Sequence, residues 1–198
     1  MFIYCLAALL IGAIPFSSYA HQLSQQELHK ISKGDPRKSR VFFLIGPWFV
    51  NFIGALDIIK AALFTAIGLM FFDSYLAAVT LATLVLLGEC YSPLKQWQGS
   101  NGILCLIGTA AVLNWQALAI LCGIYLGLLI FLPYRQISLG VLLFIAPWLF
   151  YFYDGYPFTT VFSLIAFIIF TIKIIPHIKT FLAGREPTAW EEFKQRHR

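Results

Sequence analysis

The stretch PWFVNFIGALDIIKAALFTAIGLMFF, residues Pro47–Phe72, decides the fold class of this chain. Its charged side chains are one acid and one base, Asp57 and Lys60. A membrane-spanning α-helix needs about 20 mainly apolar residues to cross a hydrocarbon layer of about 30 Å. The stretch is long enough and apolar enough to be a transmembrane helix.

The composition of the whole chain points the same way. Hydrophobic residues make up 60% of the 198 residues and charged residues 12%, and the mean hydropathy is +0.79. A water-soluble domain of this length cannot bury so much apolar surface. The composition therefore excludes a soluble globular domain, a disordered chain and a nucleic-acid-binding domain, in spite of a formal net charge of +5.

Similar apolar stretches recur along the chain, separated by clusters of glycine, proline and charge. We predict an all-α bundle of seven transmembrane helices that forms one membrane domain over residues 1–198. The predicted spans are Met1–Ala20, Pro47–Phe72, Tyr75–Leu87, Gly102–Asn114, Gln116–Leu132, Gln136–Phe152 and Pro157–Ile175. The predicted cytoplasmic segments are residues 21–46, 88–101 and 133–135 and the tail 176–198.

Two boundaries near the start need separate arguments. The first span is not expected to be a cleaved signal peptide, because no Lys or Arg precedes Lys30. A helix break is expected at Gly46-Pro47, because a helix that continued back to Val41 would overshoot the bilayer.

The basic residues predict the orientation. If seven spans alternate, 13 of the 14 lysines and arginines fall on one side of the membrane. Short cytoplasmic loops carry an excess of positive charge. We therefore expect the N-terminus outside and the C-terminus in the cytoplasm.

The remaining basic residue, Lys60, lies inside the second predicted span. Asp57 lies three residues earlier, on the same face of a helix. Ionisable groups at membrane depth are costly and are usually paired or functional. Two interpretations stay open: a structural ion pair that fixes this helix in the bundle, or a contribution of Lys60 to a site inside the bundle.

Two cytoplasmic segments have the composition of an anion site. Ser32–Arg40 combines glycine, hydroxyl groups and cations, which together suit a phosphate, although an ordinary positive patch facing lipid headgroups has the same composition. Gly99–Gly102, with the sequence GSNG, is either an anion-binding turn or a plain connection between helices. Glu89 is expected to be a solvated charge at headgroup level rather than a general base.

In order and spacing, several motifs resemble the bacterial acyl-phosphate:glycerol-3-phosphate acyltransferase family, the PlsY family. The resemblance extends from about Leu10 to Pro187. The motifs that carry it are Leu10–Phe16 (LIGAIPF), Asp57–Lys60 (DIIK), Gly88 with Tyr91, Gly99 with Gly102, and Leu182–Pro187 (LAGREP).

The resemblance implies a membrane acyltransferase of phospholipid synthesis. Such an enzyme transfers an acyl group from acyl phosphate to glycerol 3-phosphate and produces lysophosphatidic acid. No metal and no cofactor are implied, and the partners are the two substrates and membrane lipid, with no nucleic acid. The implied location is the bacterial inner membrane, as a multi-pass protein.

The resemblance also indicates residues that bind substrate phosphate, while it leaves the catalytic residue unknown. At positions that match the family motifs, these are Gly34, Ser39, Lys60, Gly99 and Gly102, with Asp57 and Lys60 as a structural or site pair. Lys33, Arg37 and Lys38 do not match the motif, and they are added as phosphate-binding candidates because their charge can replace charge that the motif lost. The chain departs from the family pattern at several positions. Only Gly34 is identical in the first loop motif, Glu89 replaces a histidine, and the lysine of the second loop is missing from Gly99–Gly102. The family's last polar motif, HRENI, corresponds here to Ile174-Ile175-Pro176-His177-Ile178. The polar residues at the start of that motif are therefore lost.

These departures keep two other functions open. One is a catalytically inactive paralogue that binds lipid or stabilises a partner protein. The other is a small transporter or channel, for which Asp57 and Lys60 are the support in the sequence.

Overall fold

The structure is a computed structural model of the chain. It describes residues 1–16, 36–93, 99–131, 134–154 and 157–182. Within these ranges, only the backbone is described at residues 36–51, 135–136, 154 and 174–182.

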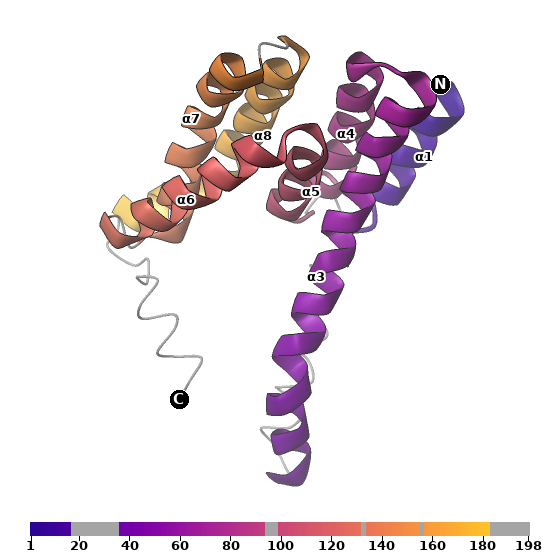
Figure 1. Ribbon diagram of the computed structural model, residues 1–198. Helices are drawn as coiled ribbons and strands as arrows, with labels where there is room; N and C mark the ends of the chain where they lie inside the picture. The colour runs from indigo at the N-terminus through magenta and orange to yellow at the C-terminus, as the bar shows by residue number, and fades with distance from the viewer. Residues whose placement is uncertain (17–35, 94–98, 132–133, 155–156, 183–198) are drawn as a thin grey trace. The chain divides into compact units, whose positions relative to one another are not determined.

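Every regular element of the described residues is an α-helix, which confirms the all-α fold (Figure 1). A helix occupies each of the seven predicted positions. The helices are α1 (Phe2–Gly12), α3 (Pro36–Phe72), α4 (Tyr75–Cys90), α5 (Ile103–Leu113), α6 (Trp115–Phe131), α7 (Arg135–Asp154) and α8 (Pro157–Leu182). The number of spans and the orientation of the termini stay predictions.

Local sequence explains several helix ends. Ser74 is the N-cap of α4 and its hydroxyl accepts a hydrogen bond from the Ala77 amide. Asn114 precedes α6, and its side chain accepts from the amide of Ala117 at 2.9 Å. The residue before the α4 cap, Asp73, has a φ of 43°, a left-handed conformation that aspartate tolerates. The chain therefore reverses within two residues between α3 and α4.

Helix α1 is shorter than predicted. It ends at Gly12 rather than continuing to Ala20. The physical reason is Pro15, which lacks an amide hydrogen and disfavours helical backbone at the residue before it. Ala13 and Ile14 therefore lie beyond the end of helix α1, and the site described below uses the carbonyl groups of both.

Helix α3 is longer than predicted. It begins at Pro36 and runs without interruption to Phe72, so the expected break at Gly46-Pro47 is wrong. A proline removes one backbone donor from a helix, and the helix here continues through position 47. Proline at position 36 suits the first turn of a helix, where its missing donor has no cost. Helix α8 likewise continues seven residues beyond Ile175, to Leu182.

The chain divides into two compact units, residues 1–112 and 113–198. In the second unit, α7 packs against α6 and α8. In the first, α4 packs against α1 and α3. Helix α4 is buried on several sides, since Leu81, Val85 and Leu86 are at most 2% exposed. The organisation of the chain as a single domain stays a prediction.

Glycines permit the close packing of the first unit. A Cβ atom added to Gly68 of α3 would lie 2.2 Å from the Cα of Ala78 on α4. A Cβ at Gly12 would lie 2.6 Å from the carbonyl oxygen of Val85, and one at Gly108 would lie 2.2 Å from that of Ile58. Small residues of this kind let helix backbones approach each other in membranes.

Large apolar side chains also cover the outside of the helices. Phe2 is 82% exposed, Met70 82% and Phe131 84%. By length and composition, one segment with described side chains, Phe52–Phe72 of α3, is sufficient to cross a membrane; in each of the other six helices the apolar segment with described side chains is 10–17 residues long. An apolar exterior suits contact with lipid and not with water.

The contact at Gly68 gives a test of the packing. Gly68→Ala is expected to destabilise the protein by about 1–3 kcal/mol, because overpacking forces two backbones apart. The matched control is Gly123→Ala, since no described atom lies within 4 Å of a Cβ added there. The measurement is unfolding by sodium dodecyl sulfate in mixed micelles, followed by tryptophan fluorescence. Equal stability of the two variants would contradict this packing.

Candidate functional site

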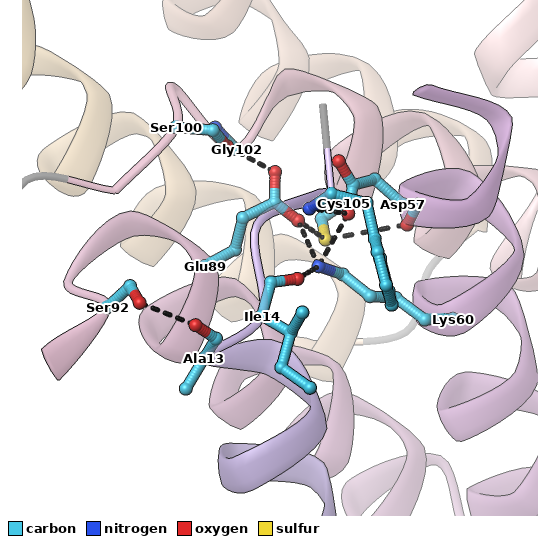
Figure 2. Close-up of polar contacts among 10 residues, drawn as sticks. Ala13, Ile14, Asp57, Lys60, Glu89, Ser92, Ser100, Gly102 and Cys105 are labelled. Atoms are coloured by element: carbon cyan, nitrogen blue, oxygen red, sulfur yellow. Dashed lines mark hydrogen bonds and ion pairs between the residues drawn. The ribbon is translucent and has the colours of Figure 1, made fainter. Parts of the chain in front are cut away.

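A cluster of polar side chains lies inside the first unit, where four helices meet. Its centre is the ammonium group of Lys60 on α3, which is 5% exposed. Figure 2 shows this group directed at Asp57, Glu89 and the backbone at Ile14. The Nζ atom lies 2.7 Å from Asp57 Oδ1 and 3.0 Å from Glu89 Oε2, and donates to the Ile14 carbonyl at 2.9 Å. An ammonium has three donors, so these three acceptors account for all of them.

Asp57 is fully buried and is one helical turn before Lys60. Its Oδ1 also accepts from the amide of Phe16 at 3.3 Å. The ring centroid of Phe16 lies 5.5 Å from Lys60 Nζ, within the range of a cation–π contact. The chain just after α1 is thus fastened to α3 by Lys60 and by Asp57.

Glu89 is also fully buried, at 0% exposure. The expectation of a solvated headgroup-level charge is therefore wrong. The physical reason is that the chain at residues 99–102 folds back over the end of α4 and contacts this residue (Figure 2). A charge in such a place needs partners, and Lys60 is one of them.

Cys105 on α5 completes the cluster and was not identified from sequence. Its thiol is 1% exposed, contacts Glu89 Oε2, and lies 3.6 Å from the backbone carbonyl oxygen of Asp57. No pattern in the sequence indicates this role, because a lone cysteine in an apolar helix is usually a small buried hydrophobe.

The loop after α4 is attached to the cluster through Ser100. The Ser100 hydroxyl donates to Glu89 Oε1, and it accepts from the Gly102 amide at 3.1 Å. The Ser100 amide donates to the Glu89 carbonyl at 3.1 Å. Gly102 has a φ of +69°, a conformation that favours glycine, and α5 begins at the next residue.

A separate hydroxyl joins α4 to the end of α1. Ser92 is fully buried, and its hydroxyl donates to the carbonyl of Ala13. This bond and the Lys60–Ile14 bond use the carbonyls of the two residues between the end of helix α1 and Pro15. The motif Leu10–Phe16 could have indicated such a break, because it contains this proline.

The structure brings together only some of the residues predicted from sequence. Asp57, Lys60, Gly99 and Gly102 lie in or beside the cluster. For Lys60, the geometry favours the interpretation as an ion pair, because protein acceptors take its three donors. Arg37, Lys38 and Ser39 lie on the first turn of α3, where the backbone alone is described. Lys33 and Gly34 lie outside the described residues.

The described residues were compared with the geometry of a metal site. No group of three or more His, Cys, Asp or Glu residues there has the geometry to hold a metal ion. The acidic groups of the cluster face an ammonium instead.

Comparisons with known proteins identify the family. The sequence matches the family profile described as "Glycerol-3-phosphate acyltransferase" over residues 2–184. A comparison with curated proteins finds no match. Because the profile covers most of the chain, the chain belongs to the glycerol-3-phosphate acyltransferase family.

Two solved structures have the same fold. They are crystal structures of PlsY (YgiH), an integral membrane glycerol 3-phosphate acyltransferase, in its glycerol 3-phosphate form and its lysophosphatidic acid form. The first is 20% identical, with a TM-score of 0.76 and 94% coverage of each chain. The second is 19% identical, with a TM-score of 0.74 and 96% coverage of each chain.

The ion-pair cluster predicts a large effect of removing its cation. Lys60→Met is expected to destabilise the protein by about 3–5 kcal/mol, because two buried carboxylates lose their counter-ion. The double variant Lys60→Met/Asp57→Asn should be more stable than Lys60→Met alone, because one uncompensated charge is removed. Unfolding in mixed micelles measures both. A loss below about 1 kcal/mol, the range of exposed ion pairs, would show that the cluster does not exist as described.

Proposed function

We propose that this member of the glycerol-3-phosphate acyltransferase family transfers an acyl group from acyl phosphate to the sn-1 hydroxyl of glycerol 3-phosphate, producing lysophosphatidic acid. The observation that carries the proposal is the family match over residues 2–184. The fold, shared with a protein whose crystal forms are named for glycerol 3-phosphate and lysophosphatidic acid, supports it.

The proposed reaction needs positioning more than chemical activation. The hydroxyl oxygen of glycerol 3-phosphate forms an ester bond with the acyl carbon, while the bond from that carbon to the phosphate oxygen breaks. Inorganic phosphate leaves, and the hydroxyl proton is released with it. Because acyl phosphate is already activated, catalysis rests on holding the substrates together and stabilising charge. No metal and no cofactor take part in this scheme.

Two parts of the chain supply groups for substrate phosphate in this proposal. The first is the loop Gly99–Gly102 with the start of α5, because peptide N–H groups at a helix N-terminus favour anions. The second is the basic segment with Lys33, Gly34, Arg37, Lys38 and Ser39. Lys60 holds the interior of the site together, since its donors are directed at protein acceptors.

The two other functions have less support. The family match and the fold do not favour an inactive paralogue. The support for a transporter or channel was the Asp57–Lys60 pair. That pair is buried, and its contacts with Ile14, Phe16 and Glu89 account for it as part of the fold.

In the proposed location, the protein is a multi-pass protein of the bacterial inner membrane, with seven spans, the N-terminus outside and the C-terminus in the cytoplasm. The apolar exterior of the helices supports insertion in lipid. The distribution of lysines and arginines supports the orientation.

Enzyme turnover tests the proposed reaction directly. Purified protein with acyl phosphate and labelled glycerol 3-phosphate is expected to produce labelled lysophosphatidic acid. An acyl-coenzyme A of the same chain length is the matched donor control and should give no product. Chelation of divalent cations should leave the rate unchanged. Absence of product above blank membranes would reject the proposal. If acyl-coenzyme A alone gives product, the acyl donor is acyl-coenzyme A and not acyl phosphate.

Thiol labelling tests the orientation. Asp73→Cys lies between the second and third predicted spans, and Tyr134→Cys lies between the fifth and sixth. A membrane-impermeant thiol reagent is expected to label Asp73→Cys in intact spheroplasts and Tyr134→Cys after the cells are opened. The parent protein, with its own four cysteines, is the background control. The reverse pattern would place the N-terminus in the cytoplasm.

A further inference from the structure

Glu89 makes more polar contacts than a simple counter-ion for Lys60 needs. Its Oε2 faces Lys60 and the thiol of Cys105, and its Oε1 accepts from the Ser100 hydroxyl. The side chain is fully buried. A buried carboxylate with three partners is fixed in position, because each of its oxygens is held.

The loop Gly99–Gly102 is held by the same residue through its main chain. The Ser100 amide donates to the Glu89 carbonyl, and the Gly102 amide donates to the Ser100 hydroxyl. Gly99 lies so close that an added Cβ would be 1.9 Å from the Glu89 carbonyl oxygen. The loop is therefore attached at both the backbone and the side chain of Glu89.

This attachment fixes the start of helix α5. Gly102 directly precedes the helix, and its carbonyl accepts from the amide of Leu106 at 3.0 Å. A chain of hydrogen bonds thus runs from Lys60 through Glu89 and Ser100 to Gly102. If the loop shifts, the first amides of α5 shift with it.

We infer that Glu89 is a positioning residue, which through Ser100 holds the loop Gly99–Gly102 in the conformation that receives a substrate phosphate group. The inference rests on the proposed function, and it deepens that function by assigning roles to Glu89 and Ser100. A bare carboxylate near a phosphate would repel it. Here the charge of Glu89 is offset by Lys60 and by two further donors, and its oxygens are turned away from solvent.

The test compares two serines whose hydroxyl groups each donate one hydrogen bond to a distant part of the chain; Ser92 is buried and Ser100 is half-buried. Ser100→Ala removes the side-chain bond from the loop to Glu89 Oε1 and the acceptor of the Gly102 amide, and it leaves the Ser100 amide–Glu89 carbonyl bond and the Lys60 ion pairs intact. Ser92→Ala removes the bond to the Ala13 carbonyl, which does not involve the loop. Ser100→Thr keeps a hydroxyl and is the conservative variant. Glu89→Ala removes the acceptor itself.

The first readout is kinetic, with KM measured separately for glycerol 3-phosphate and for acyl phosphate. Ser100→Ala is expected to raise KM for one of these substrates by fivefold or more, with kcat within twofold of the parent. Ser100→Thr and Ser92→Ala should keep both KM values within twofold. The substrate affected identifies which phosphate the loop receives. Equal KM changes in Ser92→Ala and Ser100→Ala, or no change in either, would overturn the inference.

The second readout is amide hydrogen exchange of peptides covering residues 99–106, which does not require turnover. Exchange is expected to be at least fivefold faster in Ser100→Ala and Glu89→Ala, and the double variant should be no faster than the faster single variant, since both remove the same Ser100–Glu89 bond. Glycerol 3-phosphate or acyl phosphate, added alone, should slow exchange there in the parent and not in Ser100→Ala.

The outcomes separate this inference from the proposed function. If the parent forms no lysophosphatidic acid, the proposed reaction fails, and exchange with and without glycerol 3-phosphate or acyl phosphate still decides the role of the loop. If the parent is active and Ser100→Ala has unchanged KM values and unchanged exchange, only the role of Glu89 and Ser100 fails. Lack of protection by both glycerol 3-phosphate and acyl phosphate in an inactive parent would overturn the inference as well.

Discussion

The first unit of this protein depends on one ammonium group enclosed by two carboxylates. Lys60 lies within 3.0 Å of Asp57 and Glu89 and donates to the carbonyl of Ile14, so it joins α3 to α4 and to the end of α1. Cys105 adds α5 through its contacts with Glu89 and Asp57. In an apolar interior such charges are costly unless each is paired and hydrogen-bonded. The four segments must therefore hold this one arrangement.

The surrounding helices are built to permit that arrangement. Glycines at 12, 68 and 108 leave room for backbones to touch, which brings the helices close enough for their few polar groups to meet. Pro15 ends α1 early, and the carbonyls of the two residues before it accept from Lys60 and Ser92. The loop after α4 then folds onto Glu89 and directs the start of α5. The backbone N–H groups at the start of α5 therefore lie next to a buried cluster whose charges are balanced. In this family the substrate glycerol 3-phosphate carries a phosphate group, which such N–H groups can bind.

The helices were predictable because the signal for them is local. The lengths of the apolar stretches, and the glycines, prolines and charges between them, predicted the seven described helices. Most predicted ends lie within a few residues of the observed ends. For instance, α4 was predicted at Tyr75–Leu87 and lies at Tyr75–Cys90. The break at Gly46-Pro47 was wrong because one proline does not end a helix whose other turns are intact. The Asp57–Lys60 contact was accessible from spacing alone, since residues three apart share a face of a helix.

By itself, the sequence determined an all-helical, apolar chain and one i, i+3 charge pair, which follow from local periodicity and composition. It also carries the family motifs in their order, which are identified by resemblance to the family. Only the tertiary structure decided that Glu89 is buried and that Cys105 and Ser100 contact its carboxylate. It also decided that the carbonyl of Ile14 is the third acceptor of the Lys60 ammonium group. Those contacts join residues up to 46 positions apart. Whether a charge is buried or solvated depends on what packs against it, and no pattern within one helix contains that information.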